Sequence, residues 1–312
     1  MPPKVVVICG PTASGKTALG VELALALNGE VVSADSMQVY RGMNIGTAKP
    51  TPKEMRGVPH HMLDVADPWE DYSVARYVEA ASAHTDDILC RGRLPIVAGG
   101  TGLYIDHLLA GREFAPFSGR WRETLRERRE KEGIEPLYVE LERVDPQRAA
   151  RLPLNDEKRI LRALEVWYET GETITAHDAR TRDLPPRYEA LRIGLNFRDR
   201  AILRERIDRR VDRMMEQGLA EEVRGLLSAG VPEGCTAMQA IGYKELTAAL
   251  DGEKSMETAV QEIKLRSRQY AKRQITWFRR EKNIKWILWE DTPDLERARQ
   301  EATAYLEENG LH

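Results

Sequence analysis

The first hundred residues alternate short apolar runs with stretches of helical spacing. Runs of β-branched and small apolar residues predict buried strands over residues 5–9, 30–34 and 94–98. Leucines recur at helical spacing over residues 17–27, and residues 74–91 have the same periodicity. Strands and helices therefore alternate, which predicts an α/β fold with a parallel sheet covered by helices on both faces.

The pattern changes near residue 113. Residues 121–132 are dense in Arg and Glu, and Pro185-Pro186 marks a linker before strand character returns at residues 191–196. We therefore expect two domains, which are a helical insertion at 113–187 and an α/β core made of 1–112 and 188–312.

Three further elements are expected towards the C-terminus. Helical spacing over residues 201–229 predicts one long helix, with Asp199 as its candidate N-cap and Gly230 as its end. Residues 256–280 predict a second long helix with a basic surface. Residues 285–289 have the apolar and aromatic character of a last strand.

Charge and cysteine content narrow the class of protein. The chain has 47 Lys and Arg against 50 Asp and Glu, so its net charge of −3 gives no bulk sign of a nucleic-acid binder, although charge can be segregated along a chain. Cys9, Cys90 and Cys235 have neither metal-ligand spacing nor the pattern of a disulfide framework, which favours a reducing environment. No apolar stretch of the sequence approaches the length of a membrane span. We therefore expect a cytoplasmic monomer without membrane attachment.

A phosphate-binding loop follows the first predicted strand. Gly10-Pro11-Thr12-Ala13-Ser14-Gly15-Lys16-Thr17 matches the P-loop pattern of nucleotide-binding and ATP-binding proteins, between a strand and a helix. Glycines let backbone N–H groups converge on an anion, Lys16 adds a charge, and the Thr17 hydroxyl can bind Mg²⁺. This context disfavours the alternative, a glycine-rich turn without a ligand. The motif predicts a P-loop NTPase-like core that binds a phosphate compound and Mg²⁺, with the phosphates held by Gly10, Thr12, Ala13, Ser14, Gly15, Lys16 and Thr17.

The loop alone does not identify the phosphate compound. A kinase or ATPase of this class needs a second acidic residue on Mg²⁺, expected at the end of a neighbouring strand. Here the strand at residues 94–98 ends in Gly99-Gly100-Thr101-Gly102. This difference weakens the ATPase and kinase interpretations.

An acidic residue follows the second predicted strand. Asp35 stands at the carboxyl end of that strand, the edge at which parallel sheets bind their ligands. A general base, a water-mediated Mg²⁺ ligand and a helix N-cap remain open for it. His60-His61 and Asp64 lie in a polar loop whose spacing does not favour zinc, and the role of the two histidines stays open.

Several segments taken together resemble one family, the tRNA dimethylallyltransferases, also called tRNA isopentenyltransferases. These segments run in the family's order and cover most of the chain. Eukaryotic members often carry a zinc finger with a cysteine pair. The sequence has no such pair and therefore resembles the bacterial form. The P-loop is generic, and SADSMQVY with AKRQITWFR carries the specificity. The matching segments are GPTASGKT, SADSMQVYRGMNIGTAKP, PHHMLD, GGTGLY, NDEKRILRALEV, RIDRRVDRMMEQGLAEEV, AIGYKEL and RQYAKRQITWFR.

The resemblance implies a prenyl transfer. The dimethylallyl group of dimethylallyl diphosphate would move to the exocyclic amine of the adenine 3′ of the anticodon in tRNA, and diphosphate would leave. The P-loop would hold that diphosphate with Lys16 and Mg²⁺, and no ATP would be hydrolysed, which agrees with the missing second acid. Asp35 resembles the family's general base, and Thr101 its tRNA-contacting threonine. Arg206 is a candidate for a further charge on the diphosphate, although a surface helix arginine is the alternative.

The resemblance also implies RNA contacts, because the target base must leave its stack to reach the enzyme. A basic stripe over residues 264–282 is interleaved with Trp277 and Phe278, and its alternative is a solvated helix face with two core aromatics. By resemblance, the helical insertion would clamp the anticodon stem-loop. The expected tRNA-binding residues are Asp35, Ser36, Met37, Gln38, Thr101, Arg159, Arg162, Gln239, Gly242, Lys244, Lys272, Arg273, Gln274, Trp277 and Arg279.

Three other functions remain to be compared. An adenylate isopentenyltransferase acting on free AMP or ADP would share the P-loop and Asp35, but it leaves the basic helix and the insertion without a purpose. A P-loop metabolite kinase would use ATP at the same loop. A P-loop RNA-binding or regulatory module without activity does not need the combination of an acid, a lysine and a magnesium-type hydroxyl.

Overall fold

The computed structural model divides into two compact units. One unit comprises Met1–Leu109 and Arg187–His312, and the other comprises Ala110–Pro186, which compares with an expected insertion at 113–187. At their junction, the Arg187 N–H donates a hydrogen bond to the Leu109 carbonyl oxygen at 2.9 Å. The structure describes residues 2–111, 113–115, 119–182 and 184–311.

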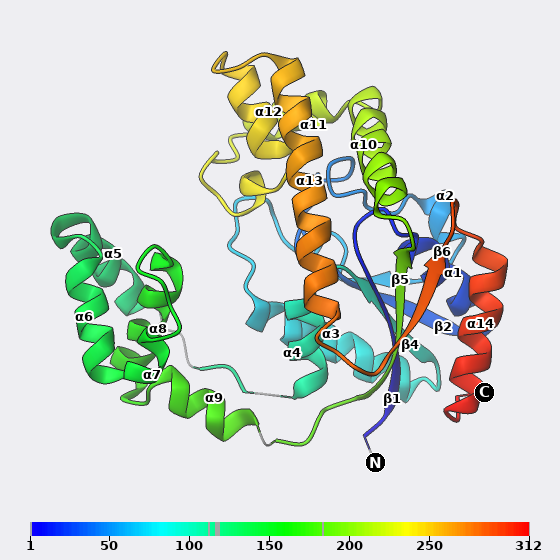
Figure 1. The fold of residues 1–312 in the computed structure, drawn as a ribbon, viewed down its shortest axis with the longest axis horizontal. Coiled ribbons are helices and arrows are strands. Elements are labelled where there is room, and N and C mark those ends of the chain that lie inside the picture. Colours follow the sequence, from blue (N-terminus) through cyan, green and yellow to red (C-terminus); the bar gives the residue numbers. More distant parts are fainter. Residues whose placement is uncertain (1, 112, 116–118, 183, 312) are drawn as a thin grey trace. The chain divides into compact units, whose positions relative to one another are not determined.

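The first unit is built on one six-stranded sheet in the order β3-β2-β4-β1-β5-β6 (Figure 1). Every pairing between these strands is parallel, which confirms the predicted sheet. Parallel strands need crossover segments, and the helices supply them. The strands are β1 (Lys4–Cys9), β2 (Gly29–Ala34), β3 (His60–His61), β4 (Leu94–Gly99), β5 (Glu189–Phe197) and β6 (Ile284–Trp289).

Helices cover both faces of this sheet. Because successive residues of a strand point to opposite faces, β1 contributes to two cores. Val6 and Ile8 pack in one cluster with α1 and α14, whereas Val5 and Val7 pack in another with α3 and α4. The helices of this unit are α1 (Lys16–Ala26), α2 (Pro52–Met55), α3 (Val74–Cys90), α4 (Gly102–Ala110), α10 (Arg200–Glu216), α11 (Leu219–Ser228), α12 (Tyr243–Leu250), α13 (Met256–Phe278) and α14 (Leu295–Glu308), with a short 3₁₀ turn at Ala237–Gln239.

A third core lies beyond the carboxyl ends of the strands. It joins the segment that follows β2 to α10, α11, α12 and the first half of α13 (Figure 1). Tyr40, Met43 and Tyr243 are fully buried in it. This layer of helices closes over the sheet edge at which the P-loop and Asp35 were expected.

The prediction of a single long helix at 201–229 is wrong. The chain forms α10 and α11, which end and begin around Gly218. Gly218 has φ +96°, in the left-handed region that interrupts a helix and that glycine enters without strain. The two expected ends are confirmed, because an Asp199 carboxylate oxygen accepts the Ala201 N–H at 2.7 Å and Gly230 has φ +83° just past α11.

The second unit consists of helices around a core of its own. Leu125, Leu137, Leu141, Ile160 and Leu164 are fully or almost fully buried in that core. Because the described residues of this core all belong to the insertion, the unit has a hydrophobic core of its own, as a separate domain does. Its helices are α5 (Arg120–Glu132), α6 (Glu135–Val144), α7 (Pro146–Ala149), α8 (Glu157–Thr170) and α9 (Ile174–Arg182).

Two further observations bear on the expectations from composition. Cys9, Cys90 and Cys235 are free thiols. Within the residues that the structure describes, no helix combines the length and the apolar character needed to cross a membrane.

Candidate active site

The P-loop connects β1 to α1 through backbone that favours glycine. Gly10 has φ +139°, and a Cβ there would lie 2.3 Å from the Leu195 carbonyl oxygen of β5, so no side chain fits. Gly15 has φ +92° and precedes the first residue of α1. The buried Trp289 indole N–H of β6 donates to the Ser14 carbonyl oxygen at 2.9 Å. The loop is therefore braced by the two strands that follow the insertion.

Lys16 lies folded back on this loop. Its ammonium donates to the Pro11 carbonyl oxygen at 2.7 Å. Burial lowers the pKa of Lys16 to about 8, with the charge of Arg210 as a second cause and the charge of Asp35 opposing both. The adjacent Thr17 side chain is exposed in the first turn of α1. The loop thus offers an ammonium, a hydroxyl and a helix N-terminus on one side, which is the chemistry of an anion site.

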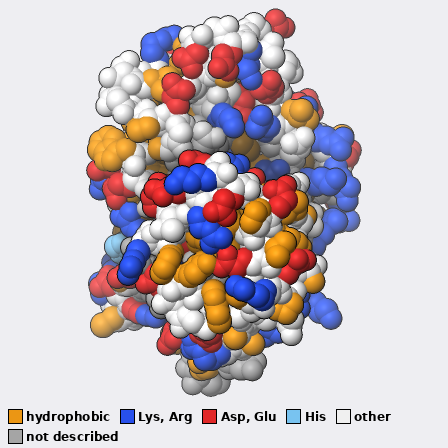
Figure 2. All heavy atoms as spheres, turned by 90° about the vertical axis from the view of Figure 1, so that its left-hand side faces the viewer, with side chains coloured by type: hydrophobic (Ala, Val, Ile, Leu, Met, Phe, Trp, Pro, Cys, Tyr) orange, Lys and Arg blue, Asp and Glu red, His pale blue; other side chains and the backbone are white. Residues whose placement is uncertain are grey.

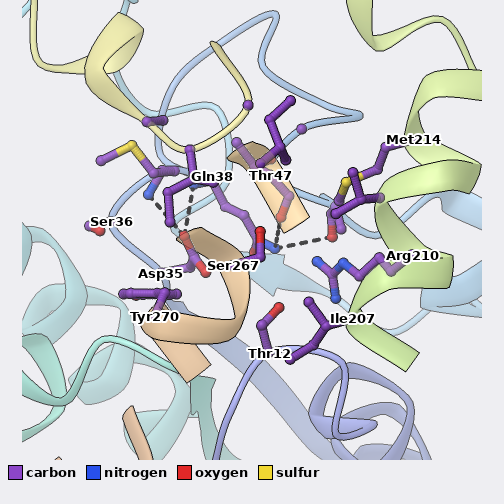
Figure 3. Close-up of a pocket in the computed structure, with 18 of the residues that line it drawn as sticks. Thr12, Asp35, Ser36, Gln38, Thr47, Ile207, Arg210, Met214, Ser267 and Tyr270 are labelled. Carbon is purple, nitrogen blue, oxygen red and sulfur yellow. Dashed lines mark hydrogen bonds between the residues drawn. The ribbon is translucent and has the colours of Figure 1, made fainter. Parts of the chain in front are cut away.

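A cavity of about 340 Å³ opens beside the P-loop, over the carboxyl edge of the sheet. Lys16, Thr17 and Asp35 line one part of it. Figure 3 shows Arg210 and Met214 reaching into it from α10, and Ser267 and Tyr270 from α13. A volume of this size holds a small ligand, and the lining combines charged groups with an apolar wall.

Asp35 lies directly after β2 and caps the turn that follows it. One carboxylate oxygen accepts the N–H of Met37 at 2.9 Å and the N–H of Gln38 at 3.3 Å. Among the described residues no cation lies within ion-pair distance of this carboxylate, although it faces the same cavity as Lys16. Asp35 is therefore not the helix N-cap that the sequence left open, because residues 36–39 form a turn and no helix begins there; one of its carboxylate oxygens accepts both bonds of this turn.

Thr101 joins this turn to the neighbouring strand. Its hydroxyl oxygen accepts the Ser36 N–H at 3.2 Å, and its own N–H donates to the Ala34 carbonyl oxygen at 3.1 Å. Tyr270 of α13 lies near the Thr101 side chain, and burial raises the pKa of the tyrosine to about 12. Ser36, Thr101 and Asp35 are therefore held together, as their common assignment to the site requires.

Arg210 is a cavity residue that the sequence analysis missed. It lines the cavity together with Lys16 and Asp35. Burial lowers the pKa of its guanidinium, and the charge of Asp35 acts in the opposite direction. Arg206, one helical turn earlier, was identified, and the spacing of four residues that places two side chains on one helix face could have identified Arg210 as well.

Arg206 lies at the P-loop but on another side of it. Its guanidinium Nε donates to the Ala13 carbonyl oxygen at 3.4 Å. The guanidinium carbon lies over the Phe197 ring, 5.2 Å from the ring centroid. It lines a neighbouring cavity of about 440 Å³, to which Arg210 and Arg213 also contribute. Arg206 thus contacts the P-loop without lining the cavity that contains Asp35, whereas Arg210 lines both cavities.

Gln274 and Gln38, both expected to contact tRNA, have side-chain amides engaged inside the protein. Gln274 accepts the Thr12 N–H at 2.8 Å and donates to the Gly100 carbonyl oxygen at 3.0 Å, so it bridges the loops after β1 and β4. Gln38 accepts the Ser33 hydroxyl at 2.9 Å and donates to the carbonyl oxygens of the next loop at 3.2 Å. Both residues line the cavity and also support its walls.

The basic stripe of α13 is divided into two parts. Lys264, Arg266 and Arg268 form ion pairs with acidic residues of α10 and α12, at 2.5 Å to Asp212, 3.0 Å to Glu245 and 2.8 Å to Asp208. Lys272 and Arg279 are exposed, and Arg273 lines the cavity. Charges are mixed more widely as well, since on the face drawn in Figure 2 acidic and basic side chains lie among one another. Among the described residues, Lys272, Arg273 and Arg279 have no acidic partner within ion-pair distance, unlike the cations of the first part.

The two aromatic residues of this stripe are packed. Phe278 is 3% exposed and belongs to the core between the sheet and α4. Trp277 is half-buried, and its indole N–H donates to an Asp106 carboxylate oxygen at 2.8 Å. Of the two interpretations of these side chains, the structure places Phe278 in the core.

The remaining expected contacts fall in three places. Gln239 and Gly242 line the cavity, and Lys244 is exposed on α12. Arg159 pairs with Asp156 at 2.7 Å on the helical unit. Arg162 of the same unit pairs with Glu165 at 3.1 Å. The arginines of the insertion are therefore ordered by local pairs and are half-buried or exposed.

The two histidines form β3, the outermost strand of the sheet, where they pair with Val31 and Val32 of β2. His61 Nε2 lies 2.7 Å from a carboxylate oxygen of Glu30, which also pairs with Arg91 and Arg93. In the part of the chain that the structure describes, no group of three or more His, Cys, Asp or Glu side chains could hold a metal ion. His61 thus takes part in an ion cluster that holds β2 and β3 to the end of α3.

Comparison with known proteins agrees with this geometry. The model of the IPP transferase family matches residues 38–281, and an isopentenyl transferase model matches residues 3–67. A tRNA dimethylallyltransferase of Thermoanaerobacter sp. (strain X514) is 46% identical over 306 residues, which is 97% of each chain. Its counterpart from Caldanaerobacter subterraneus subsp. tengcongensis is 47% identical over the same share.

Solved structures are similar over the whole chain. A tRNA isopentenylpyrophosphate transferase from Bacillus halodurans is 41% identical with a TM-score of 0.72, over 98% of this chain and 97% of that one. A eukaryotic dimethylallyltransferase, described as acting on tRNA, has a TM-score of 0.85 at 29% identity, over 98% of this chain and 80% of that one. With a family model that spans most of its length and relatives of this identity, the chain belongs to the IPP transferase family of tRNA dimethylallyltransferases.

Proposed function

We propose that this protein transfers the dimethylallyl group of dimethylallyl diphosphate to tRNA, at the exocyclic amine of the adenine 3′ of the anticodon, and releases diphosphate. The observation that carries the proposal is one cavity in which the cations Lys16 and Arg210 and the carboxylate of Asp35 meet an apolar wall. The names of the relatives support tRNA as the acceptor. The cavity lies within a single chain, and we propose a monomer acting in the cytoplasm.

The P-loop end of the cavity suits the diphosphate. Negative charge grows on this group as the carbon–oxygen bond to the prenyl carbon breaks, and fixed cations stabilise it most at that moment. Lys16 rests on the Pro11 carbonyl oxygen and can turn towards the anion, while Arg210 approaches from α10. Arg206 would add a third charge from the neighbouring cavity.

Mg²⁺ fits the same end of the cavity. The Thr17 hydroxyl is exposed in the first turn of α1, and Asp35 is the one carboxylate among the described residues that line the cavity. Because Mg²⁺ keeps several waters and binds one or two protein oxygens plus phosphate, the absence of a larger acidic cluster among the described residues is compatible with it. When bound, the ion would neutralise charge on the diphosphate.

The apolar part of the cavity lining suits the five-carbon group. Its aliphatic side chains come from α10, α11, α13 and the turn before α12, and they would exclude water from the reacting carbon. A dry wall matters here because water would otherwise compete with the amine for the prenyl group. The described aliphatic residues of this wall are Ile207, Val211, Met214, Leu219, Ile241 and Ile263.

Asp35 is the proposed general base. An adenine amine is a weak nucleophile because its lone pair is delocalised into the ring, so removal of its proton as the new bond forms lowers the barrier. One oxygen of Asp35 is fixed by two backbone N–H groups, which orients the other. Thr101 holds the same turn through the Ser36 N–H and is the proposed contact to the target nucleotide.

The acceptor must enter as an unstacked base, and we propose that cations in and around the cavity hold its backbone. Lys272, Arg273 and Arg279 on the second part of α13 are available for phosphates. Arg159 and Arg162 would contribute from the helical unit, which we propose clamps the anticodon stem-loop. Gln38 and Gln274 would act mainly by supporting the walls that the base meets.

Transfer of labelled dimethylallyl diphosphate tests the proposal. The protein is supplied with Mg²⁺ and without ATP, and unmodified tRNA and free AMP are offered in parallel. Label on tRNA alone is the expected result. Label on AMP alone would identify an adenylate isopentenyltransferase, and label on neither, with the protein shown to be folded, would refute prenyl transfer and reopen the kinase interpretation.

A further inference from the structure

The loop after Gly42 forms one wall of the cavity and is held by a single carboxylate. Gly46, Thr47 and Ala48 line the cavity. Glu222, on α11, accepts three consecutive backbone N–H groups of this loop, from Asn44 at 2.8 Å, Ile45 at 2.8 Å and Gly46 at 3.2 Å. Glu222 is not one of the described residues that line the cavity.

Tyr243 completes this arrangement from α12. Its buried hydroxyl donates to the same carboxylate at 2.6 Å, and its ring lines the cavity. A Cβ at Gly46 would lie 2.5 Å from the Tyr243 ring, so the loop backbone packs directly against the aromatic face. Loop, α11 and α12 therefore meet at Glu222 without room for a side chain between them.

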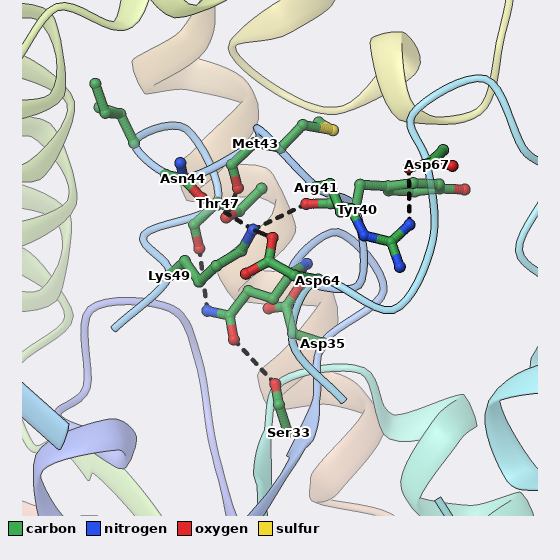
Figure 4. Close-up of polar contacts among 12 residues, drawn as sticks. Ser33, Asp35, Tyr40, Arg41, Met43, Asn44, Thr47, Lys49, Asp64 and Asp67 are labelled. Atoms are coloured by element: carbon green, nitrogen blue, oxygen red, sulfur yellow. Dashed lines mark hydrogen bonds and ion pairs between the residues drawn. The ribbon is translucent and has the colours of Figure 1, made fainter. Parts of the chain in front are cut away.

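The far side of the loop is tied to the proposed catalytic base. The carbonyl oxygens of Thr47 and Ala48 both accept the Gln38 side-chain N–H group at 3.2 Å. The backbone N–H of Gln38 in turn donates to Asp35 at 3.3 Å. Gln38 also accepts the Ser33 hydroxyl at 2.9 Å, and Figure 4 shows Thr47, Ser33 and Asp35 in this part of the structure. Hydrogen bonds, joined by the loop backbone and by the Gln38 residue itself, thus connect Glu222 to Asp35.

We propose that Glu222 is a positioning residue for the transfer reaction and that Tyr243 acts with it: together they hold the 44–48 loop as a rigid cavity wall and fix Gln38 and Asp35. This inference rests on the proposed function. The carboxylate is required because its partners are all donors, whereas a glutamine would present an N–H₂ group to some of them and leave backbone N–H groups without an acceptor. A wall displaced by about 1 Å lowers the rate of a positioned reaction by up to about a hundredfold.

Glu222→Gln tests the inference against a matched control, Glu221→Gln. Glu221 is the preceding residue of α11, is exposed, and has only a 3.7 Å ion pair with Arg224. We expect Glu222→Gln to lower kcat about tenfold or more, with the KM for tRNA within about twofold, because the tRNA-contacting cations are untouched. Glu221→Gln should match the wild type. An unchanged kcat for folded Glu222→Gln would overturn the inference.

A second pair of variants separates positioning from a purely structural role. Tyr243→Phe removes one donor to the carboxylate, and we expect a smaller decrease of kcat, about threefold. The double variant Glu222→Gln with Tyr243→Phe should be no slower than Glu222→Gln alone, because both changes act on one carboxylate. Decreases of kcat that multiply, or thermal midpoints that fall while kcat stays constant, would refute the shared positioning role.

Hydrogen exchange separates failure of this inference from failure of the proposed function. The amides of Asn44, Ile45 and Gly46 should exchange about tenfold faster or more in Glu222→Gln than in Glu221→Gln, whatever the substrate is. Faster exchange with a wild type that labels no tRNA would refute the proposed function while the loop clamp stands. Equal exchange in both variants would overturn the clamp even if the wild type transfers the label.

Discussion

Strand β2 carries a carboxylate at each end, and the two have opposite surroundings. Glu30, near the start of the strand, is 2% exposed and accepts hydrogen bonds from Arg91 and Arg93 and contacts His61. The hydrogen bond from Arg91, helped by His61, lowers the pKa of Glu30 to about 2. This carboxylate is fully paired and holds the strand order at the amino edge of the sheet.

Asp35, just past the end of the same strand, is left incomplete. Its partners are two backbone N–H groups on one oxygen, and the cations Lys16 and Arg210 line the same cavity without closing an ion pair. The difference indicates how one strand serves two purposes. A charged group that is fully paired within the protein stabilises the fold. A charged group without an ion-pair partner in the protein remains available to a ligand.

The largest expected effect is on the incomplete carboxylate. Asp35→Asn keeps the size of the side chain and one oxygen acceptor but removes the base, so we expect kcat for prenyl transfer to fall by about 10² to 10⁴. The thermal midpoint and the affinity for tRNA should stay near the wild-type values. Single-turnover kinetics with labelled donor measures the rate of prenyl transfer. A rate near that of the wild type would exclude Asp35 as the base.

The reciprocal change is at the paired carboxylate. Glu30→Gln should lower the free energy of unfolding by about 2 to 3 kcal/mol, allowing for solvent around the exposed arginines, while kcat of the folded fraction changes by less than about twofold. Because folding lowers this pKa from 4.5 to about 2, the stabilisation is present above about pH 4.5 and is lost as the pH falls towards 2. Denaturant titrations between pH 7 and pH 3 measure both. A variant whose stability matches the wild type throughout would contradict a structural role for the cluster.

The cations at the two edges should differ in their titration. Glu30 raises the pKa of Arg91, whereas burial lowers the pKa of Lys16 to about 8. We expect kcat/KM for dimethylallyl diphosphate to fall above pH 8, by up to about tenfold per pH unit, because deprotonated Lys16 no longer attracts the anion. Lys16→Arg should remove this alkaline limb whatever its effect on the rate, since arginine stays protonated. A flat wild-type profile to pH 10 would contradict the lowered pKa.

The smallest effect extends the comparison to α13, where cations are again either paired or available. Lys272→Ala with Arg273→Ala should weaken tRNA binding and reduce the slope of log K against log salt by about 1.5. The matched control is Lys264→Ala with Arg268→Ala, whose cations pair with Asp212 and Asp208. The control should change the slope by less than about 0.5. Equal effects of the two double variants would show that ion pairing does not distinguish tRNA-binding from structural cations on α13.

What the sequence predicts well is local. β1, the P-loop and α1 follow from one apolar run and one motif, and Asp35 from its place after the next run. β3 is missed because two residues, His60 and His61, carry no periodicity, and the break at Gly218 is missed because a glycine inside a helical pattern is often tolerated. Such features depend on packing against the rest of the chain.

The site is predicted in part for the same reason. Thr12, Lys16, Thr17 and Asp35 line one cavity, and the P-loop residues 13–15 line the neighbouring one. Gln38 and Gln274 look like free amides in the sequence, yet their partners come from segments that are distant in the chain or hidden in the backbone of a loop. Arg210 belongs to no recognisable motif. The role of Glu222 becomes apparent only from its hydrogen bonds to the 44–48 loop. Partners of this kind are fixed by tertiary contacts, which a single sequence does not display.

The hydrogen bond between Leu109 and Arg187 has a consequence for protein engineering. It places the two points at which the helical unit leaves and rejoins the α/β unit one backbone hydrogen bond apart. Segments attached at two adjacent points can be exchanged or deleted with little demand on the host fold. A short turn can therefore replace residues 110–186, and a comparison of tRNA binding by the shortened and the full-length protein tests whether the helical unit clamps the tRNA as proposed.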